Sequence, residues 1–528
     1  MKRTDSPAVA PAEPSSAALA PGLRTYLYVT AGFTGAAVMI VEILGAKMLA
    51  PYVGTSHFVW TAQIAVTMVA LAVGYYLGGR LVGSIPRLGR LYGAIVLAAA
   101  FLALSVAIKE PVVYAVLSLP LAAGSLLASV FLFFVPLCLL AVTGPFVVRV
   151  ITRAVSEVGG TMGRLTAVST IGSFLGTVAI GYVLIPLLPN SVTMYGTAAV
   201  LAVIALVYFV GWARKASSLT AVAVIAAAGL TAGGFGIGGG RLSTAEAEEV
   251  FRANSNFGLL QVAQLHSRPY RLFLTDYLIQ NTYDASQGRS ISMFTYMLEG
   301  LARAYAPRLD RVLCIGMGMG IVPRELARSG VSVDVVEINP AIVPVAHRFF
   351  DLDPSVFHLL VFGDGRYYLN RTTQKYDAVI LDAFIGDSSP THLMSREAFQ
   401  AVRRVLNPDG VLVMNTFADV TPPRDFMAAS LLRTLSEVFP GVKVHGVVGG
   451  NTLFVASPRA PLEILNPPSF ADVHPDALSE VREAFAGTLS ITASHGAVLT
   501  DDYNPVEYFD AANREKYRRT LAISMKSR

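Results

Sequence analysis

A cluster of three glycines in the second half of the chain has the spacing of a loop that binds a nucleotide. Gly316, Gly318 and Gly320 follow the apolar segment 312–315 and precede Pro323, which suits an early helical position. Glycines let a chain turn sharply and let its backbone approach a ligand closely at the start of a helix. The pattern therefore predicts a nucleotide against the backbone of this loop.

Two carboxylates follow at the ends of the next two predicted strands. Glu337 lies about 20 positions after Gly316, where a carboxylate accepts hydrogen bonds from both ribose hydroxyls. Asp364 lies between two glycines, where it can accept a bond from an adenine amino group. A dinucleotide fits poorly, because Ile321 replaces the third glycine of Gly-x-Gly-x-x-Gly. A single adenosine, as in a donor of the S-adenosylmethionine type, fits better.

The segments that must position these residues alternate between strand and helix, which implies an α/β Rossmann-like domain with a mostly parallel, doubly wound sheet over 286–528. Before it, strands 258–265 and 270–274 predict a small β-hairpin unit at 249–285. Within the larger domain we expect strands at 311–315, 332–337, 359–362, 378–381 and 411–415, and helices at 291–304, 323–329, 340–350 and 396–406.

The first half of the chain has the composition of a polytopic α-helical membrane domain. Hydrophobic residues make up 53% and charged residues 15% of the 528 positions, which is too apolar for a wholly soluble protein. After a disordered tail at 1–22, residues 23–240 predict about seven transmembrane helices, each able to cross about 30 Å of hydrocarbon. The expected spans are 26–50, 58–84, 91–108, 122–146, 166–188, 193–213 and 217–238.

Basic residues cluster in the connections between these spans. Because basic loops stay in the cytoplasm, these connections and the N-terminus are expected there. If the last, Ala- and Gly-rich span does not cross, six crossings return the C-terminal domain to the cytoplasm, where the donor is made. We therefore expect a cytoplasmic catalytic domain. The clusters are Arg80, Arg87 and Arg90, then Arg149, Arg153 and Arg164, then Arg214 and Lys215.

Composition also argues against two other kinds of site. The net charge of +5 is accounted for by basic residues near the membrane, so we expect no nucleic-acid partner. Cys138 and Cys314 lie in apolar segments, and His347, His358 and His392 show no paired ligand spacing. We therefore expect no metal site.

The order of the motifs resembles the spermidine synthase, or polyamine aminopropyltransferase, family. A hairpin, a glycine loop, a strand-end glutamate, Gly-Asp-Gly at 363–365 and Tyr-Asp-x-x-x-x-Asp at 376–382 follow in the family's order over roughly 250–510. Segments 49–54 and 59–61 resemble the membrane part of its multi-pass bacterial members, which implies a bacterial inner membrane. The resemblance implies decarboxylated S-adenosylmethionine as donor, an amine such as putrescine as acceptor, and 5'-methylthioadenosine as product.

The resemblance also assigns roles to individual residues. Asp382 is expected to hold and deprotonate the amine that attacks the carbon beside the sulfonium. Its alternative role is to cap Ser388 or the following helix. Gln280 is expected to approach the nucleoside, and Asp276, in the same segment, the substrate.

The chain departs from the family at three places. Met319 stands where soluble members have an aspartate that binds the donor's aminopropyl ammonium. Tyr296 keeps the tyrosine of a Tyr-His-Glu segment without its acid, and Asp387 is left to supply the second acid of an Asp-Ser-Ser-Asp segment. These losses weaken the case for a dicationic acceptor and make intact S-adenosylmethionine a more plausible donor than in a soluble member of the family. In the segment 500–507, a carboxylate either reaches the site or belongs to a solvated turn.

Two alternative functions stay open. An S-adenosylmethionine-dependent methyltransferase or lyase shares the fold. A membrane sensor or transporter would bind ligand without turnover, and Glu42, an ionisable residue in the first predicted span, supports it. The sequence leaves the acceptor and the oligomeric state open, with a homodimer as one option.

Overall fold

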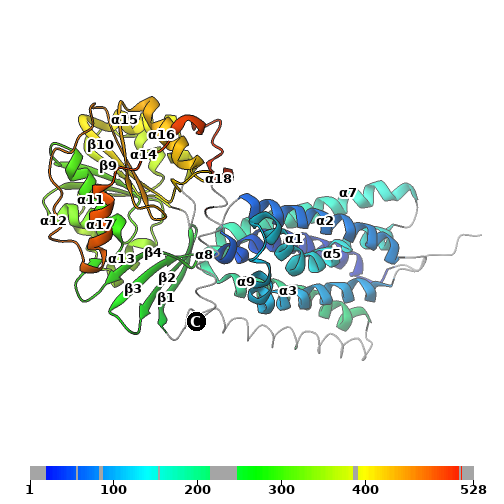
Figure 1. The fold of residues 1–528 in the computed structure, drawn as a ribbon. Coiled ribbons are helices and arrows are strands. Elements are labelled where there is room, and N and C mark those ends of the chain that lie inside the picture. The colour runs from blue at the N-terminus through cyan, green and yellow to red at the C-terminus, as the bar shows by residue number, and fades with distance from the viewer. Residues whose placement is uncertain are drawn as a thin grey trace, which may run out of the picture.

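The computed structural model contains a bundle of helices and an α/β domain that touches one end of it (Figure 1). Of the tail predicted at 1–22, only 19–22 fall within the residues that the structure describes, and α1 begins at Leu23. The described residues are 19–54, 57–82, 87–152, 155–213, 227, 246–384, 390–509 and 513.

Six helical stretches within the described residues are long and apolar enough to cross a membrane. They correspond to the first six predicted spans, while the seventh, 217–238, lies outside the described residues except for residue 227. The helices are α1 (Leu23–Val53), α2 (His57–Val82), α3 (Leu88–Val116), α4 (Leu121–Ser129), α5 (Val135–Ala141), α6 (Thr143–Ile151), α7 (Val158–Ala179), α8 (Ile185–Leu187) and α9 (Asn190–Tyr208), with π-helical turns at Val130–Phe134, Ile180–Leu184 and Phe209–Ala213.

The third span is longer than predicted. The predicted span ends at residue 108, but α3 runs through Pro111 to Val116. Val113 and Val116 are buried in the core of the bundle. Packing of this last turn therefore outweighs the backbone hydrogen bond that a proline removes.

Small residues bring α1 and α7 into close contact. A Cβ atom added to Gly172 would lie 2.0 Å from the carbonyl oxygen of Gly32, and one added to Gly176 would lie 2.6 Å from that of Ala36. Such backbone approach is typical of membrane helices packed through glycine. On its other sides α7 is the least buried of the six stretches.

The α/β domain begins with a five-stranded antiparallel sheet, larger than the hairpin that the sequence predicts. The predicted hairpin is confirmed by the pairing of β2 with β3, in which Leu260 lies opposite Thr275. One strand on one side and two on the other extend it. The order is β1 (Ala247–Ser255), β2 (Gly258–Leu265), β3 (Tyr270–Thr275), β4 (Leu278–Asp284) and β5 (Arg289–Ser290).

A seven-stranded sheet forms the rest of the domain and confirms the Rossmann-like prediction. Five neighbouring strands run parallel. Beyond them, β12 pairs antiparallel with β10 and the edge strand β11 pairs antiparallel with β12, and neither of these two strands was predicted. In spatial order the strands are β8 (Leu359–Phe362), β7 (Ser332–Glu337), β6 (Arg311–Ile315), β9 (Tyr376–Leu381), β10 (Leu406–Thr416), β12 (Thr452–Ser457) and β11 (Gly441–Gly446).

Helices cover both faces of this sheet, and the hydrophobic core lies between sheet and helices (Figure 1). The predicted helices are present with ends shifted by a few residues. They are α11 (Met293–Tyr305), α12 (Ile321–Arg328), α13 (Ile342–Phe349), α14 (Gly365–Arg371), α15 (Arg396–Val405), α16 (Phe426–Val438), α17 (Pro475–Ala486) and α18 (Val506–Phe509).

The α/β domain contacts the end of the bundle where α2 begins. The backbone N–H of His57 donates to the carboxylate of Glu507 at 3.1 Å, and the Asn254 side chain donates to the carbonyl of Leu188. At about 1.5 Å rise per residue, Arg80 near the end of α2 lies roughly 35 Å from this contact. Since α1 ends at Val53, just before α2 begins at this contact, its start at Leu23 lies at that same far end.

This arrangement bears on the side of the membrane expected for the α/β domain. An N-terminus and a C-terminal domain that are both cytoplasmic would lie at one end of a bundle that spans a bilayer. The six helical stretches return the chain to the end where α1 begins, but the domain contacts the opposite end. The sequence pattern counts spans and does not show which end of the bundle a later domain packs against, and the cytoplasmic placement of the domain stays a prediction.

Candidate functional site

A pocket lies at the carboxyl ends of β6 and β9, where the chain order of the parallel strands reverses. Open α/β sheets bind ligands at such a switch point, because the loops leave in opposite directions and open a crevice. The hairpin β3–β4 and the start of α11 contribute another side. Its polar and flexible lining residues include Gln280, Asn281, Thr295, Gly316, Met317, Gly318, Met319, Glu337, Asp364, Asp382, His392 and Asn415.

The glycine loop enters this pocket through residues with left-handed backbone. φ is +89° at Gly316, +52° at Gly318 and +75° at Gly320. A Cβ atom on Gly316 would lie 2.1 Å from the carbonyl oxygen of Asp382, whereas one on Gly318 would meet nothing within 4 Å. The missing side chain at Gly316 therefore lets the loop touch the end of β9.

Glu337 ends β7 with its carboxylate turned toward the glycine loop. One oxygen accepts from the backbone N–H of Met317 at 2.8 Å, and the other accepts from Asn339 at 2.7 Å. Burial raises the pKa of Glu337, and the N–H donors oppose that rise without cancelling it. Each carboxylate oxygen of Glu337 has a second lone pair that can accept from a ribose hydroxyl. The contact with ribose stays a prediction.

Asp382 is oriented by a relay of two asparagines. The Asn415 amide donates to one carboxylate oxygen of Asp382 at 2.9 Å, and the Asn451 amide donates to the Asn415 oxygen at 2.9 Å. Asn415 is buried at the end of β10, so the relay holds the carboxylate at the pocket wall. Asn415 was not among the predicted site residues, although it is the last residue of the predicted strand 411–415, next to β9.

The pKa of Asp382 is raised to about 6. Burial is the main cause, the hydrogen bond from Asn415 lowers the value, and the negative charge of Glu337 raises it further. A carboxylate with this pKa is ionised at neutral pH and binds a proton more readily than an exposed aspartate. Such a group suits general-base catalysis.

If Asp382 is the base, kcat/KM should rise about tenfold per pH unit below pH 6 and level off above it, because only the ionised carboxylate accepts a proton. In Asn415→Leu the carboxylate loses a donor that stabilises its charge, so we expect the inflection to move up by roughly one pH unit. A pH–rate profile of both proteins tests this. An unmoved inflection would assign the titration to another group.

Asp364 caps α14 and contacts a histidine. One carboxylate oxygen accepts from the backbone N–H of Tyr367 at 2.8 Å, and the other lies 2.8 Å from Nε2 of His392. Burial acts to raise the pKa of Asp364, but these two contacts outweigh it, and the pKa is lowered. His392, one of the histidines without metal-ligand spacing in the sequence, lines the pocket and is hydrogen-bonded there.

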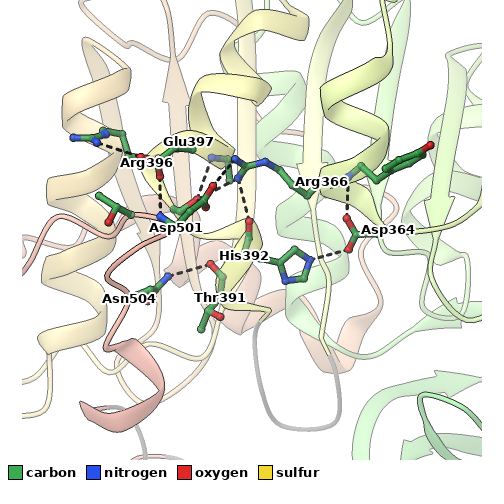
Figure 2. Close-up of polar contacts among 12 residues, drawn as sticks. Asp364, Arg366, Thr391, His392, Arg396, Glu397, Asp501 and Asn504 are labelled. Carbon is green, nitrogen blue, oxygen red and sulfur yellow. Dashed lines mark hydrogen bonds and ion pairs between the residues drawn. The ribbon is translucent and has the colours of Figure 1, made fainter.

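The C-terminal segment holds this histidine in place, as Figure 2 shows. Asp501 accepts from Arg366 at 3.1 Å and from the Ser395 hydroxyl. Arg366 also donates to the carbonyl of His392 at 3.2 Å, and Asn504 donates to that of the preceding residue at 3.0 Å. Asp501 is thus a residue that positions His392 beside the pocket.

Replacing Asp501 by Asn should raise the KM for the donor roughly tenfold and leave kcat nearly unchanged, since a charge-assisted contact to Arg366 is lost. Asp502→Asn, at an exposed neighbouring position, is the matched control and should behave like the unchanged protein. Steady-state kinetics with varied donor checks both. A fall in kcat at constant KM would instead place Asp501 in the chemical step.

The other predicted substrate contacts divide between the pocket and its surroundings. Gln280 lines the pocket. The carboxylate of Asp276 accepts from the backbone N–H of Leu259 at 3.0 Å. Asp276 and Tyr277 have φ of 49° and 63°, which is typical of the tight type I′ hairpin turn. Asp276 is therefore part of the hairpin turn and not of the pocket lining.

Tyr296 points away from the pocket, and the residues that precede it in the sequence line the pocket instead. Its hydroxyl donates to the carbonyl of Ser290 at 2.5 Å and accepts from the backbone N–H of His474 at 3.3 Å. Thr295 and Phe294 are the pocket residues of this turn of α11. Asp387 lies outside the described residues, and among the residues that are described no group of three or more His, Cys, Asp and Glu side chains is arranged to hold a metal.

The fold and the pocket define a Rossmann-like domain whose glycine loop, strand-end carboxylates and relay-held aspartate meet at the switch point of its sheet. Comparison with known proteins agrees with this class. Residues 292–448 match the family model of the Spermine/spermidine synthase domain. This match supports the spermidine synthase family for the C-terminal domain.

Three relatives illustrate the likeness. A polyamine aminopropyltransferase of Vibrio vulnificus (strain CMCP6) is 41% identical over 119 residues, 22% of this chain and 40% of that protein. A putrescine N-methyltransferase 2 of Nicotiana attenuata is 34% identical over 128 residues, 22% of this chain and 34% of that protein. An N-terminal histidine N-methyltransferase of Emericella nidulans is 30% identical over 142 residues, 25% of each chain. The chain thus covers well under half of each relative, and these likenesses support a transferase.

Proposed function

We propose that the chain is a membrane-bound aminopropyltransferase that moves an aminopropyl group from decarboxylated S-adenosylmethionine to an amine such as putrescine. The observation that carries this proposal is the contact between the glycine loop and Asp382. The loop lies so close to Asp382 that a Cβ atom at Gly316 would collide with the Asp382 carbonyl oxygen. Asp382 and the loop line the same pocket, so a nucleoside that lies on the loop would have its reactive end near the Asp382 carboxylate. The family match at 292–448 supports the same assignment.

The proposed reaction is a displacement at the carbon beside the donor sulfur. The lone pair of the amine nitrogen forms the new C–N bond, and the electron pair of the breaking C–S bond goes to sulfur, which leaves as the neutral thioether 5'-methylthioadenosine. Asp382 accepts the proton that the nitrogen loses. Alignment by Glu337 and the loop supplies the rest, because a held nucleophile and electrophile need little further activation.

Methyl transfer from intact S-adenosylmethionine is the second candidate function. Two of the three relatives are named as N-methyltransferases. Met319, buried in the pocket lining, adds no charge to attract a donor ammonium. The amine and the proton acceptor would be the same, and only the transferred group would differ.

Product analysis separates the two candidates. Purified protein is incubated with either donor and with putrescine, and the products are identified by mass spectrometry. Methylthioadenosine together with an amine extended by an aminopropyl group supports the first proposal, and S-adenosylhomocysteine with a methylated amine supports the second. Release of neither nucleoside product with any tested amine would contradict both and leave ligand binding without turnover.

We further propose that the bundle lies in a membrane and that the α/β domain is on the extracytoplasmic side. The apolar stretches support the first part. For the second, the far end of the bundle has Arg80, Arg90, Arg149 and Arg164, and basic ends stay in the cytoplasm. The donor would then have to cross the bilayer before it reached the pocket. The predicted homodimer stays a prediction.

Cysteine labelling tests this orientation. Val448→Cys places a thiol on the exposed surface of the α/β domain, and Val155→Cys places one at the far end of the bundle. With a membrane-impermeant maleimide and intact spheroplasts, we expect label at position 448 and label at position 155 only after permeabilisation. The reverse pattern would put the domain in the cytoplasm and the basic connections outside.

A further inference from the structure

A second cavity, of about 890 Å³, lies within the helical bundle and is separate from the pocket of the α/β domain. Residues of α1, α2, α5, α6 and α7 line it, on the side of α1 where α7 packs. Its lining mixes hydroxyl groups, one cation and apolar side chains. A protein interior normally pairs or excludes such groups, so a cavity of this composition suits an amphipathic ligand.

The hydroxyl of Thr143 is the first sign of a missing partner. Thr143 is 2% exposed, lines the cavity, and has no hydrogen-bond partner for its side-chain oxygen within the described part of the chain. The side-chain oxygen of Thr152, the residue that follows α6, lacks one as well. Thr143 lies deeper in the bundle, where a bilayer offers no water, so a ligand in the cavity is placed to supply its partner.

Arg149 supplies the charge. It lines the cavity and lies six residues after Thr143 on α6, about 9 Å nearer the basic end of the bundle at 1.5 Å rise per residue. The lining contains no Asp or Glu, and no described carboxylate forms a salt bridge with Arg149. A ligand with a negative group at this level would be its counter-ion.

The inner part of the cavity is apolar. Val38, Met39, Leu71 and Leu140 line it deeper in the bundle than Arg149. From the end of the bundle inward, the lining offers Arg149 and the Thr152 hydroxyl beside apolar residues at the start of α7, then hydroxyl groups such as that of Thr143, then hydrocarbon. The phosphate, ester carbonyls and acyl chains of a phospholipid follow in that same order.

We infer that this cavity is a binding site for an anionic phospholipid, with its phosphate at Arg149, an ester carbonyl accepting from Thr143, and acyl chain against the apolar residues. The inference rests on the proposed position of the bundle in a membrane and is independent of the proposed transferase activity. Anionic lipids are attracted by basic residues at the cytoplasmic face, which is the face that the charge pattern assigns to this end of the bundle.

Native mass spectrometry of the purified full-length protein tests the site. It is titrated with phosphatidylglycerol and with phosphatidylcholine of the same acyl chains, and with inorganic phosphate as competitor. We expect one tightly held phosphatidylglycerol and a preference over phosphatidylcholine that Arg149→Gln reduces roughly fivefold. Arg164→Gln removes a charge from α7 at the same end but outside the lining, and should leave the preference intact. Thr143→Val should weaken both lipids.

Three results would overturn the inference. Equal binding of the two lipids would remove the role of charge, and an equal loss in Arg149→Gln and Arg164→Gln would point to general surface attraction. Displacement of the lipid by phosphate alone would identify a simple anion site. A variant is compared only if it elutes from size-exclusion chromatography at the same volume as the unchanged protein. If Arg149→Gln does not fold, Thr143→Val, which keeps shape and charge, tests the lipid site independently. Failure of these tests leaves product analysis unaffected.

Discussion

Replacing Asp382 by Asn should lower kcat for amine transfer roughly 100- to 10,000-fold, because the variant lacks the carboxylate that accepts the proton of the attacking amine. Asn has nearly the same shape, and Asn415 can still bond to its amide oxygen, so the pocket should keep its form. Single-turnover measurement of amine transfer with saturating donor gives the rate directly.

Donor binding provides the control for this variant. Isothermal titration with methylthioadenosine should give a dissociation constant within about threefold of that of the unchanged protein, since the proposed reaction places Asp382 on the acceptor side of the nucleoside. Asp377→Asn is a second control, because Asp377 lies on β9, the strand that Asp382 follows, but accepts from the backbone N–H groups of Asp310 and Arg311 away from the pocket. Undiminished turnover in Asp382→Asn would remove this residue from the chemistry.

Gly316→Ala should abolish donor binding and destabilise the α/β domain by roughly 2–4 kcal/mol. Its new methyl group would lie 2.1 Å from the carbonyl oxygen of Asp382, and its φ of +89° is strained for alanine. Because the obstructing atom is backbone, relief requires the glycine loop and the end of β9 to move apart. Denaturant unfolding and titration with methylthioadenosine measure the two effects.

Gly318→Ala is the matched control in the same loop. Its φ is also positive, at +52°, but nothing lies within 4 Å of the added Cβ atom. We expect only the cost of a left-handed alanine, about 1 kcal/mol, and donor binding that persists. If the two variants lost binding equally, the contact between loop and Asp382 would not be what shapes the pocket.

The predicted residues that the structure brings to the pocket are those whose place is determined by local pattern. Glu337 and Asp382 follow apolar strands, and parallel strands bring their carboxyl ends to one edge of the sheet, so both line the pocket. Gly316 and Gly318 do so for the same reason, since their loop follows β6, whereas Gly320 precedes α12 and is not part of the pocket lining. Here the order of elements along the chain was sufficient.

The positions of the remaining residues depend on contacts between distant segments, or on how far one residue turns a side chain around a helix. Asn415 reaches its partner Asn451 because β10 pairs with β12, and nothing near either residue marks that pairing. Tyr296 follows Thr295 on a helix, where one residue turns the side chain by about 100° and out of the pocket. Asp276 is drawn to Leu259 by a tight turn.

The proposed transfer reaction depends most on a nucleoside that lies on the glycine loop with its reactive end toward Asp382. A structure of the protein with 5'-methylthioadenosine bound tests this most directly. We predict that the ribose lies within hydrogen-bond distance of Glu337, the adenine lies near Asp364, and the sulfur faces the Asp382 carboxylate across a space that an amine can fill. A nucleoside bound elsewhere, or one whose sulfur points away from Asp382, would contradict the account.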